Sequence, residues 1–187
     1  MQVRSTTMNR IFARSVACAL LGLTTGITHA FAAPVGPAAP ALAAYMAATK
    51  IPCYTQAGEG SCTIKSLDQG VHLFHGKPDA GTDEAVAFVE YQYDATGNGM
   101  DQMAIVLRLV AGKWIVVGRA DNTTGSSPRN VRFSPGAITY VGTVMGANDN
   151  RANPTGKGSF RLAVGERSVS FVKDRAKGRS MSDEIRR

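Results

Sequence analysis

The chain has 187 residues, 44% of them hydrophobic, with 21 Lys and Arg, 14 Asp and Glu, and three cysteines. A chain of this length and composition can bury the core of one domain, which excludes a wholly disordered or fibrous protein. The formal net charge of +7 leaves open a basic surface that binds anionic partners.

The first 32 residues have the features of a secretory signal peptide. Three arginines precede an apolar run at 15–28, and Ala30-Phe31-Ala32 fits an A-x-A cleavage site. Cleavage there starts the mature chain at Ala33, and cleavage after Ala30 is the nearby alternative. An uncleaved anchor would need about 20 apolar residues, more than this run contains. The sequence therefore predicts a bacterial protein that is periplasmic or secreted, with no membrane span in its mature chain.

Removal of this segment would take away three basic residues and no acidic one, which leaves 18 minus 14, or +4. Much of the remaining basicity lies in the last segment, 173–187. Such a tail can bind nucleic acid or an anionic membrane surface, but an exported protein meets little nucleic acid. We expect a solvated, disordered tail and no nucleic-acid partner.

Two cysteines, Cys53 and Cys62, remain in the mature chain on either side of a Gly-rich turn. In an oxidising compartment such a pair is expected to form a disulfide. A redox-active or metal-binding pair is the alternative, but the C-x-x-C spacing and a nearby His or Cys are both missing.

The predicted elements begin after a flexible Pro- and Ala-rich segment at 33–40. Ala41 to Lys50 predicts a short amphipathic helix that packs on a sheet, and Ile51-Pro52 ends it. Alternating or β-branched patterns then predict a series of strands. The expected strands are VHLFH at 71–75, Thr82 to Tyr93, Gln102 to Val110, Trp114 to Arg119, RNVRF at 129–133, Gly136 to Met145, SFRLAV at 159–164 and RSVSFV at 167–172.

Three local features refine this prediction. In the strand from Thr82 to Tyr93, the alternation places Val86, Phe88 and Glu90 on one face and Ala87, Val89 and Tyr91 on the other. The tripeptide at 111–113 predicts a hairpin turn, and the interior Gly142 predicts a bulge or a close backbone approach. The fold class is therefore mainly β with an α+β margin: a single domain at 41–172, with six to eight antiparallel strands in a half-barrel or sandwich and one N-terminal helix.

His72 and His75 could suggest a metal site. Residues three apart on a strand face opposite sides of a sheet, so the two imidazoles cannot share an ion there. We therefore expect no metal at this pair.

The turn from Asp94 to Asp101 is acidic and glycine-rich, and it joins two predicted strands. Oxygen ligands from Asp94, Thr96, Asn98 and Asp101 could form a weak calcium site. Ile105 stands where an EF-hand loop has its closing Glu, so a plain hairpin loop, with glycines at positive φ, is the favoured interpretation.

A second polar loop, Gly146 to Gly158, contains Asn148, Asp149, Arg151 and Lys157. Its Gly-Lys pair lacks the remaining residues of a phosphate-binding loop. A partner-binding loop that uses these four side chains is one interpretation, and a structural loop closed by its own hydrogen bonds is the other.

Sequence motifs for hydrolysis are missing: the chain has neither a G-x-S-x-G nor an H-E-x-x-H motif. The sequence thus favours a non-enzymatic protein without a cofactor, and the weak calcium site is the one alternative to the absence of a cofactor. We expect it to bind a protein or a cell-envelope component through its loops.

Two resemblances accompany this interpretation. The D-x-T-G-x-G-x-D turn and the N-D-x-R-x-x-P-T-G loop at 148–156 resemble a group of small exported bacterial β-rich proteins of unknown function, which implies an exported module without known catalysis. The hairpin VLRLVAGKWIVVGR resembles the strand hairpin of nuclear-transport-factor-2-like proteins. That second resemblance implies the alternative function, a small-ligand binder or enzyme with a pocket in a curved sheet.

Overall fold

The computed structural model describes residues 34–67, 69–94, 100–150 and 153–172. The predicted signal peptide and the predicted tail lie outside the described residues. By its internal contacts the chain divides into Met1–Ala30 and Phe31–Arg187, and every described residue belongs to the second unit. None of the helices within these ranges is long and apolar enough to cross a membrane.

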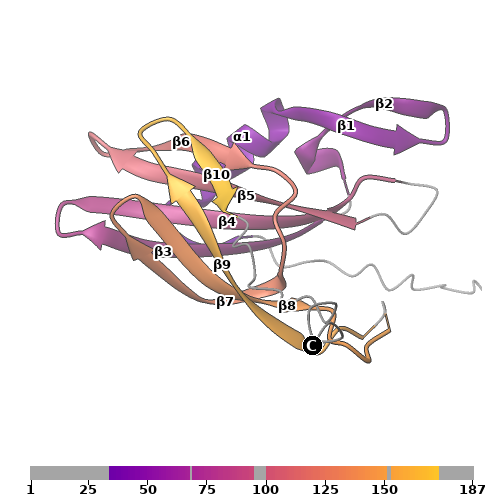
Figure 1. The fold of residues 1–187 in the computed structure, drawn as a ribbon. Coiled ribbons are helices and arrows are strands. Elements are labelled where there is room, and N and C mark those ends of the chain that lie inside the picture. The colour runs from indigo at the N-terminus through magenta and orange to yellow at the C-terminus, as the bar shows by residue number, and fades with distance from the viewer. Residues whose placement is uncertain (1–33, 68, 95–99, 151–152, 173–187) are drawn as a thin grey trace, which may run out of the picture. The chain divides into compact units, whose positions relative to one another are not determined.

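The second unit contains one α-helix, one short 3-10 helix and ten strands among its described residues (Figure 1). In chain order they are α1 (Ala39–Ala48), β1 (Lys50–Thr55), β2 (Gly58–Thr63), η1 (Ile64–Ser66), β3 (Gln69–Asp79), β4 (Thr82–Gln92), β5 (Met100–Val110), β6 (Lys113–Ala120), β7 (Ser126–Ser134), β8 (Ala137–Val144), β9 (Gly156–Val164) and β10 (Val169–Val172).

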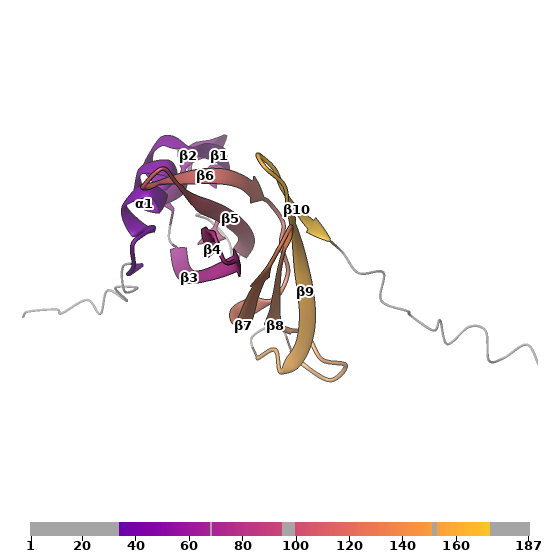
Figure 2. The same ribbon diagram turned by 90° about the vertical axis from the view of Figure 1, so that its left-hand side faces the viewer.

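The strands form two four-stranded sheets, ordered β3-β4-β5-β6 and β10-β9-β8-β7, and a separate β1-β2 hairpin. All of these strand pairs are antiparallel. Figure 2 shows the two sheets facing each other, and β3 contacts β7 while β6 contacts β10 at their margins. The predicted mainly-β class with one helix is confirmed. The strand count exceeds the predicted six to eight because the cysteine loop itself forms a hairpin.

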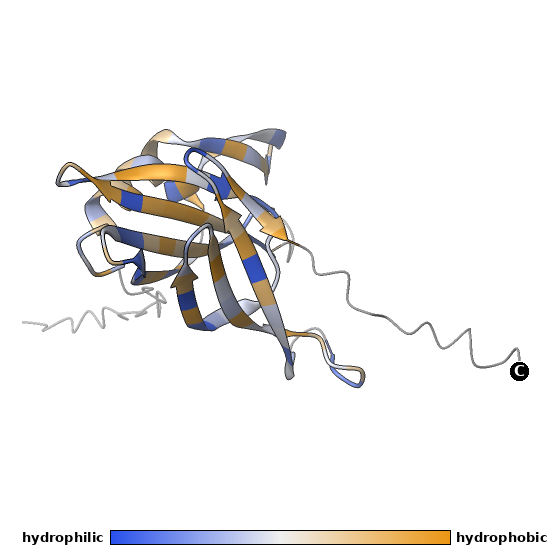
Figure 3. Cartoon of the chain, turned by 60° about the vertical axis from the view of Figure 1, so that its left-hand side comes forward, coloured by the Kyte–Doolittle hydropathy of each residue, from blue (hydrophilic) through white to orange (hydrophobic). Residues whose placement is uncertain are grey.

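β4 and β5 lie at the centre of the unit and are buried on both faces. The odd-numbered Ala87 and Val89 pack with α1 in one hydrophobic cluster. The even-numbered Val86 and Phe88 pack with the second sheet in another. The predicted division of this strand into two faces is confirmed. Figure 3, coloured by hydropathy, shows apolar stretches (orange) on strands of both sheets.

Helix α1 covers the outer face of the first sheet with Leu42 and Met46. It begins at Ala39, inside the segment predicted to be flexible, because a proline fits the first turn, where no N–H is required. Ala38 is fully buried, and its N–H donates to His75 Nε2 at 3.4 Å. The last residues of the predicted flexible segment are therefore part of the packed structure.

Aromatic side chains join the two sheets. The ring of Tyr140 lies 4.4 Å from that of Phe88 and 5.3 Å from that of Phe160, centroid to centroid. Its hydroxyl donates to the Thr124 carbonyl at 2.7 Å, and burial raises the pKa of the phenol. The buried phenol therefore stays protonated. Tyr140 contributes an apolar ring to the core, and its hydroxyl has a hydrogen-bond acceptor in the Thr124 carbonyl.

The predicted close approach at Gly142 is confirmed. A Cβ built at this residue would lie 2.5 Å from the Cα of Gly125, in the segment that connects the two sheets. Gly125 itself has φ of +97°, which also favours glycine. The two backbones touch here without any intervening side chain.

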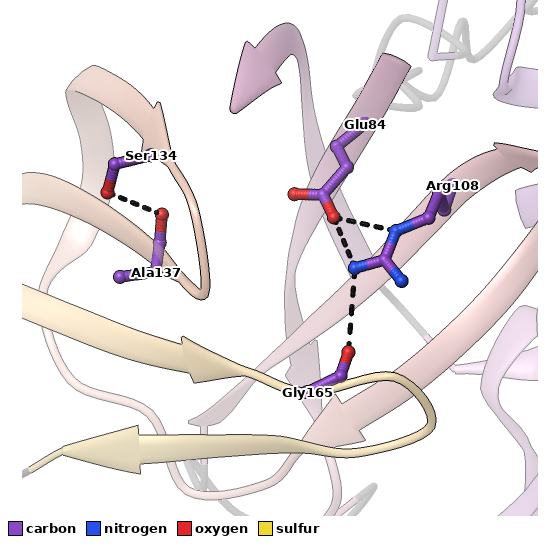
Figure 4. Close-up of polar contacts among 5 residues, drawn as sticks. All are labelled: Glu84, Arg108, Ser134, Ala137 and Gly165. Atoms are coloured by element: carbon purple, nitrogen blue, oxygen red, sulfur yellow. Dashed lines mark hydrogen bonds and ion pairs between the residues drawn. The ribbon is translucent and has the colours of Figure 1, made fainter. Parts of the chain in front are cut away.

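Glu84 and Arg108 form an ion pair between neighbouring strands of the first sheet (Figure 4). Glu84 Oε1 accepts from Arg108 Nη2 at 2.6 Å and from Nε at 2.9 Å. The glutamate side chain is only 3% exposed. Arg108 Nη2 also donates to the carbonyl of Gly165, in the turn before β10, at 3.5 Å.

Candidate functional site

The disulfide between Cys53 and Cys62 is present, with 5.8 Å between the Cα atoms, as predicted. It joins β1 to β2, and this hairpin lies against the end of β4. The N–H of Tyr54 donates to the Tyr93 carbonyl at 2.7 Å, and Tyr54 forms a parallel bridge with Asp94. The disulfide hairpin and the start of the predicted calcium turn are thus brought together.

A cleft of about 300 Å³ lies between this hairpin and the first sheet. Its lining combines apolar residues of β1 with polar side chains from β4, β5, β6 and the segment after β6. The residues that line the cleft include Pro52, Tyr91, Tyr93, Asp101, Arg119 and Asp121.

Tyr91 and Asp101 face each other across β4 and β5, where they are register partners. The Tyr91 hydroxyl donates to Asp101 Oδ2 at 3.5 Å, and the backbone N–H of Gln102 donates to Oδ1 at 2.8 Å. Burial, followed by the charges of Asp101 and Asp121, raises the pKa of Tyr91 to about 12. The phenol therefore stays protonated at neutral pH and can donate a hydrogen bond, but it cannot act as a base.

Arg119 and Asp121 form a two-point ion pair at the other side of the cleft. Nε lies 2.7 Å from Oδ1, and Nη2 donates to Oδ2 at 3.0 Å. A guanidinium has five N–H donors, and this pair uses two of them. Arg119 is thus held in a fixed orientation with donors left for a ligand.

Two large hydrophobic side chains are exposed at positions close in sequence to the lining residues Pro52 and Asp101, and the second of them, Met100, lines a neighbouring cleft with Gln102. Tyr54 is 46% exposed and Met100, the register partner of Gln92, is 59% exposed. We call the surface formed by Tyr54, Tyr93, Met100 and Arg119 the hairpin end. Its side chains come from β1, β5, β6 and the residue after β4, so it exists only in the folded unit.

A buried polar network lies next to the hairpin end. The Gln102 side chain donates to the Gly125 carbonyl at 3.2 Å and to Glu90 Oε1 at 3.3 Å, and its amide oxygen accepts from Thr123 Oγ1 at 2.9 Å. Gln102 and Thr123 are buried. The network fixes the segment between the two sheets, and no motif in the sequence pointed to it.

The predicted calcium ligands lie partly outside the described residues, since Thr96 and Asn98 fall in 95–99. In the described ranges, no group of three or more His, Cys, Asp or Glu side chains could hold a metal. Within the described part of the chain, Asp101 accepts one hydrogen bond on each carboxylate oxygen. Calcium binding at this turn stays a prediction.

The predicted loop at 146–158 overlaps the start of β9, and the segment at 145–155 that joins β8 to β9 is organised by Asp149. The carboxylate accepts from the backbone N–H groups of Gly146, at 2.7 Å, and Gly156, at 3.3 Å, and also from the Thr155 N–H and hydroxyl. These bonds, led by that of the Thr155 N–H, lower the pKa of Asp149 to about 2. The local bonds favour the structural interpretation of this residue. Asn148 is exposed in the turn, Lys157 is exposed on β9, and Arg151 lies outside the described residues.

The lowered pKa gives this loop a defined acid sensitivity. Because the folded-state pKa is below the ordinary value of 3.8, the stabilisation by Asp149 is present above about pH 4 and is lost as the pH falls towards 2. We expect the amide resonances of Gly146, Thr155 and Gly156 to shift together in this window in an NMR titration. Asp149→Asn should remove that common transition, and independent titration of the three amides would contradict the assignment.

His72 and His75 lie on opposite faces of β3, as predicted. The flanking Val71 and Leu73 pack in the helix-side cluster, and Phe74 packs in the other. The His75 ring stands edge-on to Trp114 at 5.7 Å, and burial lowers the pKa of its imidazole. Beside these two rings lies a second cleft of about 390 Å³, which Glu84 also lines.

Comparisons with protein-family models, curated proteins and solved structures give no match for this chain. The resemblance to exported bacterial β-rich proteins stays a prediction. The case for function rests on the site itself.

Proposed function

We propose that this chain is an exported, non-enzymatic binding protein and that a protein partner docks on the hairpin end. The observation that carries the proposal is the exposure of Tyr54 and Met100 next to residues that line the cleft containing Arg119: Tyr54 follows Pro52 by two positions, and Met100 precedes Asp101. Tyrosine, methionine and arginine are among the residue types enriched in protein interfaces. Tyr54 lies on the disulfide-linked hairpin, and Met100 and Arg119 lie on β5 and β6, so ordered elements hold all three side chains of the docking surface.

The chemistry of the cleft supports binding rather than catalysis. Tyr91 is a protonated donor to Asp101, and Arg119 is paired with Asp121. Neither pair contains a nucleophile next to a base. A partner would meet fixed hydrogen-bond donors and acceptors there.

The disulfide supports the proposed export. Such bonds persist in the periplasm and outside the cell, whereas cytosolic thiols are kept reduced. Cys53 and Cys62 are bonded in the structure, and the third cysteine, Cys18, lies within the predicted signal peptide.

Site-specific photo-crosslinking in a bacterial host that exports the chain tests the proposal. A photoreactive amino acid at Tyr54 or Met100 is expected to capture the same protein. Val110 and Ile115 are 46% and 48% exposed and lie near the β5–β6 turn, at the other end of β5 from Met100. The photoreactive amino acid should capture no protein at either of these positions. Arg119→Ala should weaken capture from position 100 by about tenfold, as expected for an interface hot spot. Equal capture at all four positions, or capture at none, would contradict the docking surface.

A small-ligand binder of the nuclear-transport-factor-2-like kind is the second candidate. The cleft beside Trp114 favours it, because an aromatic ring, Leu109 and the buried Glu84 line one concavity. Trp114 is the single tryptophan of the chain, so its fluorescence would report an occupant directly. For the calcium hypothesis, calorimetry on the wild type and on Asp94→Ala is the corresponding measurement.

A further inference from the structure

Charge is distributed unevenly along the chain. Residues 33–121 contain six basic and nine acidic residues, or −3, whereas residues 122–187 contain twelve basic and five acidic residues, or +7. The mild total of +4 therefore conceals an acidic first part and a strongly basic second part. Such asymmetry is typical of proteins that bind an anionic partner through one region.

The structure places the basic part on a sheet. The four strands β7–β10 contain Arg129, Arg132, Lys157 and Arg161 and no acidic residue. Six further basic residues follow β10 in the sequence at 173–187.

Strand register puts these four cations on one face. Arg129 and Arg132 are three apart on β7, but a register shift between them brings both to the side of Val141 and Thr139. Arg132 pairs with Thr139, which pairs with Arg161, and Lys157 pairs with Thr143. The intervening Ile138, Tyr140 and Leu162 are buried against the first sheet. Because neighbours along a strand point to opposite sides, the cations face away from the core. Arg132, Lys157 and Arg161 are exposed.

None of these four side chains takes part in the ion pairs formed within the described residues. Arg129 donates to the Ser127 carbonyl and to Thr143 Oγ1, both at 3.3 Å, and is partly buried. The nearby Asp149 already accepts four hydrogen bonds from its own loop. The positive charge of the face is therefore available to an outside partner.

We propose that the outer face of the β7–β10 sheet binds the surface of an anionic phospholipid bilayer. The cations lie on β7 and β9, which are two strands and therefore roughly 10 Å apart. Exposed hydroxyls of Thr139, Ser159 and Ser170 lie on the same face. A charged surface that spreads in two dimensions matches a plane of lipid phosphates better than it matches one linear polyanion. This site is separate from the hairpin end and does not depend on it.

Vesicle co-sedimentation of the predicted mature chain, Ala33 to Arg187, tests the proposal. Mixed phosphatidylglycerol and phosphatidylcholine vesicles should bind the protein, and vesicles of phosphatidylcholine alone should not. The triple variant Arg132→Gln, Lys157→Gln, Arg161→Gln should bind about 100-fold more weakly, because each cation near such a surface contributes roughly a fivefold gain in affinity.

A matched control separates the face from net charge. Lys50→Gln, Lys65→Gln, Lys113→Gln removes three exposed lysines from the first part of the chain and leaves the same net charge and the whole basic tail. This variant should keep binding within about threefold of the wild type. Both triples should unfold at the wild-type temperature, since all six side chains are exposed.

Three results would overturn the proposal: no binding to the phosphatidylglycerol vesicles, equal losses in the two triple variants, or tighter binding to soluble polyphosphate than to the vesicles. The last result would assign the face to a soluble polyanion. Photo-crosslinking at Tyr54 and Met100 should be the same in both triples, so failure of the membrane site would leave the hairpin-end proposal standing, and the converse also holds.

Discussion

Replacing Arg108 with methionine is expected to lower the free energy of unfolding by about 3 to 5 kcal/mol. The change leaves the carboxylate of Glu84, only 3% exposed, without its guanidinium partner. It also removes the contact to the Gly165 carbonyl that connects the first sheet to the turn before β10. Urea denaturation of wild type and variant measures the difference.

The chain offers its own control in the ion pair between Lys77 and Asp83. These groups lie 3.3 Å apart, but the pair is exposed to solvent, so Lys77→Met should cost less than about 1 kcal/mol. The double variant Glu84→Leu, Arg108→Met removes both charges of the pair and should recover most of the stability lost in the single variant. If Arg108→Met were no more damaging than Lys77→Met, the buried pair would have no special importance.

Gly142→Val is expected to destabilise the unit by about 3 kcal/mol through overpacking. The new side chain would meet the backbone of Gly125, which cannot rotate away as a flexible side chain can. The two sheets would have to separate locally, and Tyr140 would be displaced from its bond to Thr124. Thermal and urea unfolding should both report the loss.

Gly60→Val is the matched substitution, because Gly60 is also in a strand. A Cβ built at Gly60 would have its nearest neighbouring atom 3.9 Å away, which is an ordinary contact distance. We expect a change within about 0.5 kcal/mol there. A similar loss at both positions would mean that valine acts through the strands themselves and that the Gly125 contact is unimportant.

The alternation of apolar residues predicted the central strands and both of their faces, because a two-residue period is a property of the local sequence. It did not predict the full length of β3. Gly76, Lys77 and Pro78 are typical of a turn, yet the strand continues through Asp79. Gly76 lies where the Phe133 ring of β7 packs, so a contact between the two sheets accounts for a glycine that resembled a loop residue.

The candidate site was less accessible to prediction. Tyr91, Asp101 and Arg119 come from three strands, and only their register brings them to one cleft. For Asp149 the sequence left two interpretations open, a partner-binding residue and part of a structural loop closed by its own hydrogen bonds. Its carboxylate accepts from the backbone of its own loop, which favours the second interpretation, and that arrangement depends on a loop conformation that a polar sequence does not specify.

The burial of β4 and β5 on both faces has a consequence for how the protein responds to stress. The same two strands complete the core under helix α1 and the core between the sheets. Neither core can open without exposing one face of these strands, so damage on one side weakens the other. The unit should therefore lose its structure in a single cooperative transition, with the amide protons of β4 and β5 exchanging last.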